Sequence, residues 1–204
     1  MPVTRVKICG LTRVEDALAT EDAGADAIGL NFVPNTKRFI SLSRAEEISK
    51  ALSPFMARVG VFRNASFETI LETVESVGLN SVQLNGQESD DFAARVAQLR
   101  PVIRAISFKP NLKLPENDTL LIDGLDPGSG QTFDWAALKT VKLEGRRWLL
   151  AGGLNPDNVA AAVRQLQPWC VDVASGVEAS AGVKDPQLVR AFIERAKMAL
   201  ETQA

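Results

Sequence analysis

The chain has 204 residues, of which 46% are hydrophobic and 24% charged, and its formal net charge is −2. This composition is typical of a globular protein with one substantial core, and so weak a charge offers little attraction for nucleic acid or an anionic membrane surface. No segment has the apolar length of a signal-peptide core or a membrane helix, so we expect a cytoplasmic protein without nucleic-acid or membrane partners.

The chain contains no histidine and only two cysteines, Cys9 and Cys170. Histidine is the commonest general base and metal ligand in proteins, so any acid–base chemistry here must use Asp, Glu, Lys or Cys side chains. The two cysteines lack the short spacing of a zinc motif, and two thiols cannot form a disulfide framework. We therefore expect neither a metal site nor a stabilising disulfide.

Short apolar runs alternate with helical patterns along the whole chain. Strands are predicted at 3–9, 25–33, 56–62, 81–85, 101–108, 118–123, 147–153 and 170–176. Helices are predicted at 12–24, 43–52, 66–77, 89–100, 134–140, 155–167 and 185–200. The helix at 43–52 is predicted to start with Ser43 as its cap, and the helix at 155–167 has Pro156 at its start. The segment 109–117 contains two prolines, which favour a loop in place of a fifth helix.

The alternation of eight strands with helices predicts an α/β protein whose parallel strands are joined by crossover helices. Eight such units favour a closed (β/α)8 barrel, the TIM-barrel fold, although 204 residues is small for that fold. An open, doubly wound sheet is the structural alternative. No break in composition divides the chain, so residues 1–204 are predicted to form a single catalytic domain.

In a barrel strand, alternate side chains face the outer helices and the barrel interior. If the apolar positions of each strand face outward, polar side chains from five strands point into the barrel. These are Lys7, Cys9, Gln83, Asn85, Arg104, Asp123 and Asp172. For Lys7, Gln83 and Arg104, a buried polar network that neutralises its own charges explains the pattern equally well.

Cys9 and Asp123 differ from the other inward residues because each is the last strand residue before a glycine, Gly10 or Gly124. This places both side chains at the C-terminal mouth, where barrels of this kind carry their chemistry. Cys170 starts its strand at the opposite end, so it is interpreted as a small buried hydrophobe that cannot bridge to Cys9.

Two glycine-containing segments have the pattern of a phosphate-binding cradle. The first, at 151–158, ends the seventh strand with Gly152 and Gly153 and enters a helix, and the second, at 174–178, follows the eighth strand and contains Ser175 and Gly176. Glycine lets the backbone approach a phosphate, and free N–H groups at helix starts hold the anion. Because the loops after strands seven and eight commonly bind phosphate in such barrels, we expect a phosphorylated substrate.

Several segments together resemble a known family. The stretches "VKICGLTRVEDA", "LLIDGLDPGSGQTFDW", "LAGGLNP" and "VDVASGVE" occur in the order found in phosphoribosylanthranilate isomerases of tryptophan biosynthesis, and the resemblance runs along essentially the whole chain. Membership would imply an isomerase that performs a cofactor-free Amadori rearrangement. Its substrate would be N-(5′-phosphoribosyl)anthranilate, and its product 1-(2-carboxyphenylamino)-1-deoxyribulose 5-phosphate.

The resemblance also implies catalytic roles, with Asp123 matching the general acid of the family and Cys9 its general base. A carboxylic acid that donates a proton at neutral pH needs a raised pKa, whereas a cysteine base needs a pKa lowered by a cation. Lys7 lies two residues before Cys9 on the same face and could supply that positive potential.

The same resemblance assigns substrate contacts. Arg38 matches the arginine that binds the anthranilate carboxylate, and a planar guanidinium suits that anion better than the neighbouring Lys37 ammonium. Gly152, Gly153, Ser175 and Gly176 match the phosphate loops. Asp172 matches an inward aspartate and is assigned a supporting substrate contact.

Other residues near the mouth are interpreted with reference to the family. The segment 128–130, Gly-Ser-Gly, is expected to be a mobile loop, and Asp126 beside Pro127 is better explained by turn geometry than by acid catalysis. Asn85 stands where the family often has histidine, so that position is not expected to be an essential acid or base.

Two other functions remain open at this point. The related barrel isomerase of histidine biosynthesis carries an aspartate where this chain has Cys9, which argues against that activity. A non-catalytic phosphosugar-binding module would keep the phosphate loops but lose the acid or the base, and Cys9 and Asp123 are both present. The expected partner is a small phosphosugar, and the expected assembly is a monomer or a homodimer.

Overall fold

Eight parallel strands close into a barrel in the computed structural model, which describes residues 4–108, 114–115, 119–124, 135–138, 141, 143 and 145–200. The strands are β1 (Arg5–Cys9), β2 (Ala27–Asn31), β3 (Ala57–Phe62), β4 (Ser81–Leu84), β5 (Val102–Ser107), β6 (Thr119–Asp123), β7 (Trp148–Leu150) and β8 (Cys170–Val173). The barrel closes because the last strand, β8, pairs in parallel with the first strand, β1, with Lys7 opposite Asp172 in the register. The predicted (β/α)8 barrel is therefore confirmed, and the open-sheet alternative is excluded.

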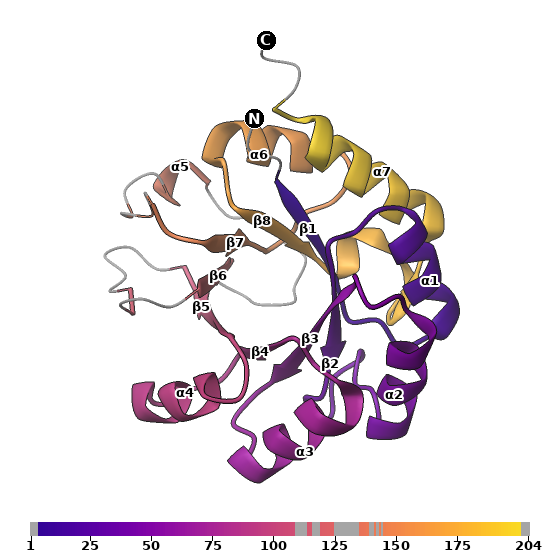
Figure 1. The fold of residues 1–204 in the computed structure, drawn as a ribbon. Helices are drawn as coiled ribbons and strands as arrows, with labels where there is room; N and C mark the ends of the chain where they lie inside the picture. Colours follow the sequence, from indigo (N-terminus) through magenta and orange to yellow (C-terminus); the bar gives the residue numbers. More distant parts are fainter. Residues whose placement is uncertain are drawn as a thin grey trace.

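Seven α-helices in the described part of the chain surround the barrel (Figure 1). They are α1 (Val14–Asp22), α2 (Leu42–Ala51), α3 (Phe67–Val77), α4 (Asp90–Ala97), α5 (Trp135–Leu138), α6 (Val159–Leu166) and α7 (Pro186–Met198). None of these helices is long and apolar enough to cross a membrane. The buried faces of the helices pack on the outward side chains of the strands and form the larger of two hydrophobic clusters.

Helix α1 begins at Val14, two residues after the predicted start, and the starts of α2 and α6 also differ from the prediction. Helix α2 is capped by Ser41, whose hydroxyl accepts a hydrogen bond from the Arg44 amide, so the cap lies two residues before the predicted Ser43. Helix α6 begins at Val159 because Asn155 and Asn158 hold the preceding segment as a turn. Pro156 therefore precedes the helix.

The prediction of a loop in place of a fifth helix falls mostly outside the described residues. Leu114 and Pro115 are described and have no regular secondary structure. After β8 the structure contains a short 3-10 turn, η1 (Ser175–Val177), and a hairpin of β9 (Glu178–Ser180) and β10 (Val183–Lys184). This hairpin was not predicted, and it places two charged side chains beside the barrel mouth.

A second, smaller apolar cluster fills the barrel interior. It consists of Val59, Ile103, Leu121, Leu149, Ala151 and Cys170. The presence of Ile103 in this cluster, with Ala105 packed against it, shows that the predicted orientation of β5 is wrong, because these two residues face inward while Val102 and Ile106 pack on the outer cluster. A small barrel has an apolar interior as well as an apolar outer layer, so hydrophobicity alone does not decide which face of a strand points inward.

Arg104 consequently faces outward from β5, in register with Leu84 and Leu120 of the outer layer. Its guanidinium donates to the Asp90 carboxylate at 3.0 Å and to the Glu88 carbonyl at 2.9 Å, near the start of α4. Arg104 is therefore not part of the barrel interior. The predicted inward positions on β1, β4, β6 and β8 agree with the register.

Candidate active site

Cys9 and Asp123 are the last residues of β1 and β6, and both are half-buried at the C-terminal mouth. Gly29 on β2 pairs with Cys9, and a Cβ placed on Gly29 would lie 2.6 Å from the Cys9 sulfur. The thiol therefore occupies space that only a glycine neighbour leaves free. The Asp123 carboxylate accepts a hydrogen bond from the Gly124 amide at 2.8 Å, and a Cβ on Gly152 would lie 2.8 Å from its Oδ1.

The Cys9 thiol is surrounded by charged groups of both signs. Burial raises its pKa, the charges of Lys7 and Lys184 lower it, and Asp172 raises it again. The net pKa lies above the ordinary value, although Lys7 does supply the positive potential that its position two residues before Cys9 indicated. The physical reason is that burial of the thiol outweighs the cations, of which Lys7 is already paired with a carboxylate.

Lys7 and Asp172 form a buried ion pair in the barrel interior. The Lys7 ammonium lies 2.7 Å from Asp172 Oδ1, and their side chains are 1% and 10% exposed. Burial lowers the pKa of Lys7, but Asp172 and Cys9 raise it further, so it stays above its ordinary value. Asp172 thus holds Lys7 beside Cys9, and this structural role exists alongside the substrate contact that the resemblance assigns to it.

Arg38 lies in the connection between β2 and α2 and makes a bidentate pair with Glu178. Its Nε and Nη2 donate to the two carboxylate oxygens at 2.7 Å and 2.8 Å. Lys184 donates to the same Glu178 carboxylate and to the Ala174 carbonyl, each at 2.9 Å. Burial raises the pKa of Glu178, but the hydrogen bonds from Arg38 and Lys184 lower it below its ordinary value.

The predicted phosphate loops lie against each other. Gly176 in η1 is so close to the β7–α6 loop that an added Cβ would lie 1.9 Å from the Leu154 carbonyl oxygen. Gly152 and Gly153 have positive φ angles of 90° and 64°. The structure thereby brings Gly152, Gly153, Ser175 and Gly176 together beside the mouth, as a phosphate cradle requires.

Asn158 is a positioning residue that the sequence patterns did not indicate. Its side-chain nitrogen donates to the Gly153 carbonyl at 2.9 Å, while its oxygen accepts from the Asn155 amide at 2.8 Å. These bonds hold the glycine segment in its turn. The residue type was a usable signal, because asparagine is common at helix caps and in turns. It was missed because the predicted helix began at residue 155, which placed Asn158 inside it.

Gly176→Ala should disturb this cradle. Because the added methyl cannot fit beside Leu154, one of the two loops must move, and we expect a loss of about 1–3 kcal/mol in stability together with a higher KM for a phosphorylated substrate. Thermal unfolding and steady-state kinetics measure both effects. Gly78→Ala is the control for KM: its positive φ of 69° strains alanine, so stability should fall there too, but this glycine ends α3 and has no neighbour within 4 Å, so KM should not change. An unchanged KM for Gly176→Ala would show that the loop contact does not support substrate binding.

Gln83 and Asn85 face inward as predicted. The buried Gln83 amide donates from Nε2 to Asn85 Oδ1 at 2.8 Å. Asn85 thus participates in a hydrogen-bonded amide pair at the position where the resembled family often has histidine. Asp126 and the Gly-Ser-Gly segment 128–130 lie outside the described residues.

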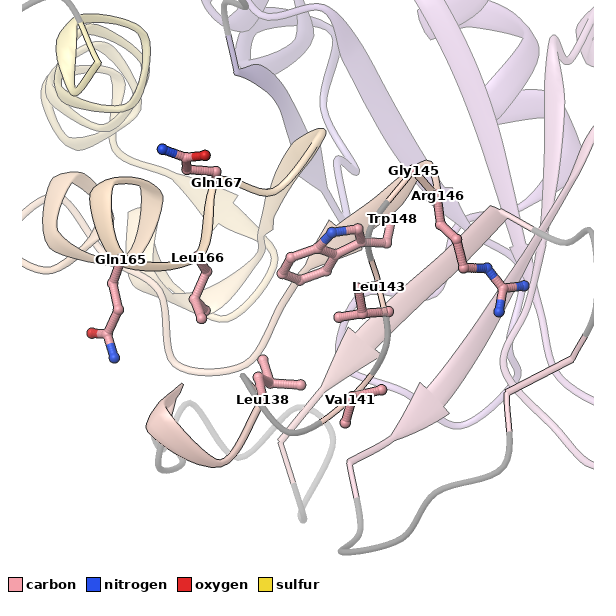
Figure 2. Close-up of a pocket in the computed structure, with 9 residues that line it drawn as sticks. All are labelled: Leu138, Val141, Leu143, Gly145, Arg146, Trp148, Gln165, Leu166 and Gln167. Atoms are coloured by element: carbon pink, nitrogen blue, oxygen red, sulfur yellow. The ribbon is translucent and has the colours of Figure 1, made fainter.

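A separate pocket of about 470 Å³ lies between α5, α6 and the start of β7 (Figure 2). Its lining consists of Leu138, Val141, Leu143, Gly145, Arg146, Trp148, Gln165, Leu166 and Gln167. These residues precede β7, begin it at Trp148 or end α6, so the pocket is at the N-terminal end of the barrel and contains no residue of the candidate site. Among the described residues, no cluster of three or more His, Cys, Asp or Glu side chains could hold a metal ion.

A closed barrel whose mouth gathers a thiol, a carboxyl group, an arginine and two touching glycine loops is typical of (β/α)8-barrel enzymes that act on phosphorylated substrates. A family model described as "N-(5'phosphoribosyl)anthranilate (PRA) isomerase" matches residues 6–195. The chain belongs to this isomerase family.

Individual relatives agree with this assignment. The N-(5'-phosphoribosyl)anthranilate isomerase of Thermotoga neapolitana is 43% identical over 204 residues, which cover 96% of this chain and 99% of the relative. The crystal structure of phosphoribosyl anthranilate isomerase from Thermus thermophilus is 40% identical with a TM-score of 0.89, covering 98% and 100% of the two chains. A second solved structure is a complex of phosphoribosyl anthranilate isomerase with reduced 1-(o-carboxyphenylamino)-1-deoxyribulose 5-phosphate. It is 40% identical, has a TM-score of 0.86, and the match covers 95% of this chain and 98% of that chain.

Proposed function

We propose that this chain isomerises N-(5′-phosphoribosyl)anthranilate to 1-(2-carboxyphenylamino)-1-deoxyribulose 5-phosphate, with Asp123 as general acid and Cys9 as general base. The activity is that of its family, a step in tryptophan biosynthesis. The observation that carries the assignment of roles is the placement of these two groups at the ends of β1 and β6, each beside a glycine that leaves room for the side chain.

The reaction needs one acid and one base. The carboxylic acid of Asp123 protonates the ring oxygen as the C1′–O bond breaks, and the nitrogen lone pair forms an iminium ion. The Cys9 thiolate then removes the proton on C2′, and the electron pair of that C–H bond gives an enolamine. Proton return to C1′ and loss of the hydroxyl proton at C2′ produce the ketone, so atoms and electrons balance without a cofactor.

The remaining side chains and loops bind the two ends of the substrate. We assign the phosphate to the backbone around Gly152, Gly153, Ser175 and Gly176, because N–H groups in glycine turns and at helix starts bind such anions. The anthranilate carboxylate is assigned to Arg38. Glu178 occupies Nε and Nη2 of this arginine, and Nη1 takes no part in that pair. The ligand of the related complex carries both a carboxyphenyl group and a phosphate, which supports a site with two anion-binding ends.

The test is spectroscopic. The substrate is generated in situ from anthranilate and a phosphoribosyl donor, and its conversion is followed by the change in anthranilate-type fluorescence. Wild-type protein is expected to convert it, and absence of conversion by folded protein would contradict the proposed function. Parallel incubation with the aminoaldose substrate of the histidine pathway tests the alternative isomerase activity. That alternative would require this substrate to be converted faster than N-(5′-phosphoribosyl)anthranilate. A phosphosugar-binding module would bind the substrate without converting it.

Arg38→Lys should raise KM by roughly 10–100-fold and change kcat much less, because an ammonium cannot reproduce the planar, multidentate contact of a guanidinium. The neighbouring Lys37→Met is the matched control, since Lys37 is exposed and should leave KM unchanged. Steady-state kinetics on both variants measure the effect. Equal KM values for wild type and Arg38→Lys would remove Arg38 from the carboxylate site.

The proposed setting is the cytoplasm, with the whole activity carried by the one barrel and a small phosphosugar as partner. The assembly is a monomer or a homodimer. Phe55 is 96% exposed, and a homodimer that covered it would bury apolar surface. Light scattering at several protein concentrations measures which of the two states forms.

A further inference from the structure

Lys184 is a buried lysine that the proposed mechanism does not use. Its side chain is 1% exposed, although it belongs to the two-residue strand β10 near the surface of the barrel mouth. The ammonium donates to Glu178 and to the Ala174 carbonyl, and the Lys184 backbone amide donates to Asp16 at 2.9 Å. These hydrogen bonds hold the hairpin β9–β10 in place, with the Lys184 ammonium directed into the protein.

The charges around Cys9 do not cancel. Lys7 on β1 pairs with Asp172 on β8, and Arg38 makes a bidentate pair with Glu178 on β9. Lys184 shares the Glu178 carboxylate that Arg38 already occupies. The Asp16 carboxylate, which accepts the Lys184 backbone amide, pairs with Arg13 at 3.9 Å. The other three cations therefore share two carboxylates, which leaves one positive charge in this cluster, while Asp123 stands at the end of β6 as a further titratable group of the mouth.

The strand register places the Lys184 ammonium near the thiol: it donates to the carbonyl of Ala174, the residue after Val173, and Val173 pairs with Ile8, the residue before Cys9. The charge of Lys184 lowers the pKa of Cys9, and the charge of Cys9 raises the pKa of Lys184. Burial lowers the pKa of Lys184 below its ordinary value, and the Glu178 carboxylate, which favours the charged ammonium, opposes this effect only in part. Lys7 lowers the pKa of Cys9 more than Lys184 does, but Lys7 has Asp172 to itself, whereas Lys184 shares Glu178 with Arg38.

We propose that Lys184 is a positioning residue for the thiolate: held by Glu178, it supplies the uncompensated positive charge that lets Cys9 ionise inside the barrel mouth. The hairpin β9–β10 then belongs to the catalytic machinery although it bears no reacting group. The effect on catalysis rests on the proposed function, whereas the effect on the thiol can be observed without any substrate.

The test is the pH dependence of Cys9 alkylation by iodoacetamide, with the modified cysteine identified by mass spectrometry. Only the thiolate reacts, so the midpoint of the rate reports the ionisation of Cys9. Lys184→Met is expected to move the midpoint to higher pH and to slow alkylation about 3–10-fold at pH values below it, as loss of one nearby charge requires. Lys184→Arg should restore the wild-type midpoint because it restores the charge.

The matched control is Lys197→Met. Lys197 also donates to a backbone carbonyl, that of Gly24, and pairs with a carboxylate, that of Asp26, but at the other end of the barrel. Its removal should leave the Cys9 midpoint unchanged. The same midpoint in wild type and in folded Lys184→Met would overturn the proposal, and so would a shift of equal size in Lys197→Met.

The kinetic consequence separates this proposal from the proposed function. In Lys184→Met, the acidic limb of kcat should move to higher pH by the same amount as the alkylation midpoint, and kcat should approach the wild-type value at alkaline pH. A structural defect would lower kcat at every pH instead, and that result would count against the positioning role. If wild-type protein did not isomerise the substrate, the proposed function would fail while the alkylation result still decided the role of Lys184.

Discussion

Cys9→Ala should lower kcat by about 10²–10⁴-fold, the usual contribution of a positioned general base. The loss is expected in kcat because the phosphate loops and Arg38 still bind the substrate when the thiol is absent. Alanine leaves the fold intact at this position, since the Cys9 side chain lies against a glycine and creates no large cavity when removed. Steady-state kinetics with in situ substrate, supported by circular dichroism of the folded variant, measure the effect.

The pH profile adds a signature of the same base. A thiol base is active only as the thiolate, so activity should fall as the pH decreases through the pKa of Cys9. Because burial raises that pKa, the fall should begin at a higher pH than it would for a free thiol. Cys170→Ala is the matched control, because Cys170 lies in the apolar barrel interior at the start of β8 and has no role in the mechanism. Near-wild-type kcat in Cys9→Ala, or an equal loss in Cys170→Ala, would refute the assignment of the base.

Asp123→Asn should produce a second loss in kcat of about 10²–10⁴-fold. Asparagine keeps the size of the side chain and an oxygen that can accept the Gly124 amide, but it has no acidic proton to donate to the ring oxygen. The geometry of the mouth is thereby retained while the chemistry is removed. The alkaline limb of the pH profile, which reports loss of the acid's proton, should disappear with it.

Asp157→Asn is the control for this variant. Asp157 lies in the β7–α6 loop, where its exposed side chain pairs with Arg195, so the same substitution there should leave kcat unchanged. Surface ion pairs of this kind contribute at most about 1 kcal/mol to stability. If Asp123→Asn retained near-wild-type activity, another group would have to protonate the ring oxygen.

The barrel and the ends of its strands could be predicted from the sequence because the alternation of elements and the glycines after Cys9 and Asp123 are local signals. The orientation of Arg104 could not, because both faces of β5 carry apolar neighbours and only the closed barrel decides between them. The choice between Ser41 and Ser43 as the cap of α2 likewise depends on which hydroxyl reaches the Arg44 amide.

The electrostatics of the site depended on contacts that no sequence pattern contains. Glu178 lies within the "SGVE" segment, but its pairing with Arg38, 140 residues away, exists only in the folded protein. Lys184 reaches the mouth through a hairpin in a segment for which the sequence patterns predicted no element. The direction of the Cys9 pKa shift follows from burial in three dimensions, so the sequence could indicate a nearby cation but not the balance of effects.

The central claim is that Cys9 removes the C2′ proton of the substrate, and a single-turnover experiment tests it most directly. With enzyme in excess over N-(5′-phosphoribosyl)anthranilate, the fluorescence change reports conversion of bound substrate and does not depend on product release. The account predicts rapid conversion by wild type and conversion about 10²–10⁴-fold slower by Cys9→Ala. Equal single-turnover rates for the two proteins would contradict it.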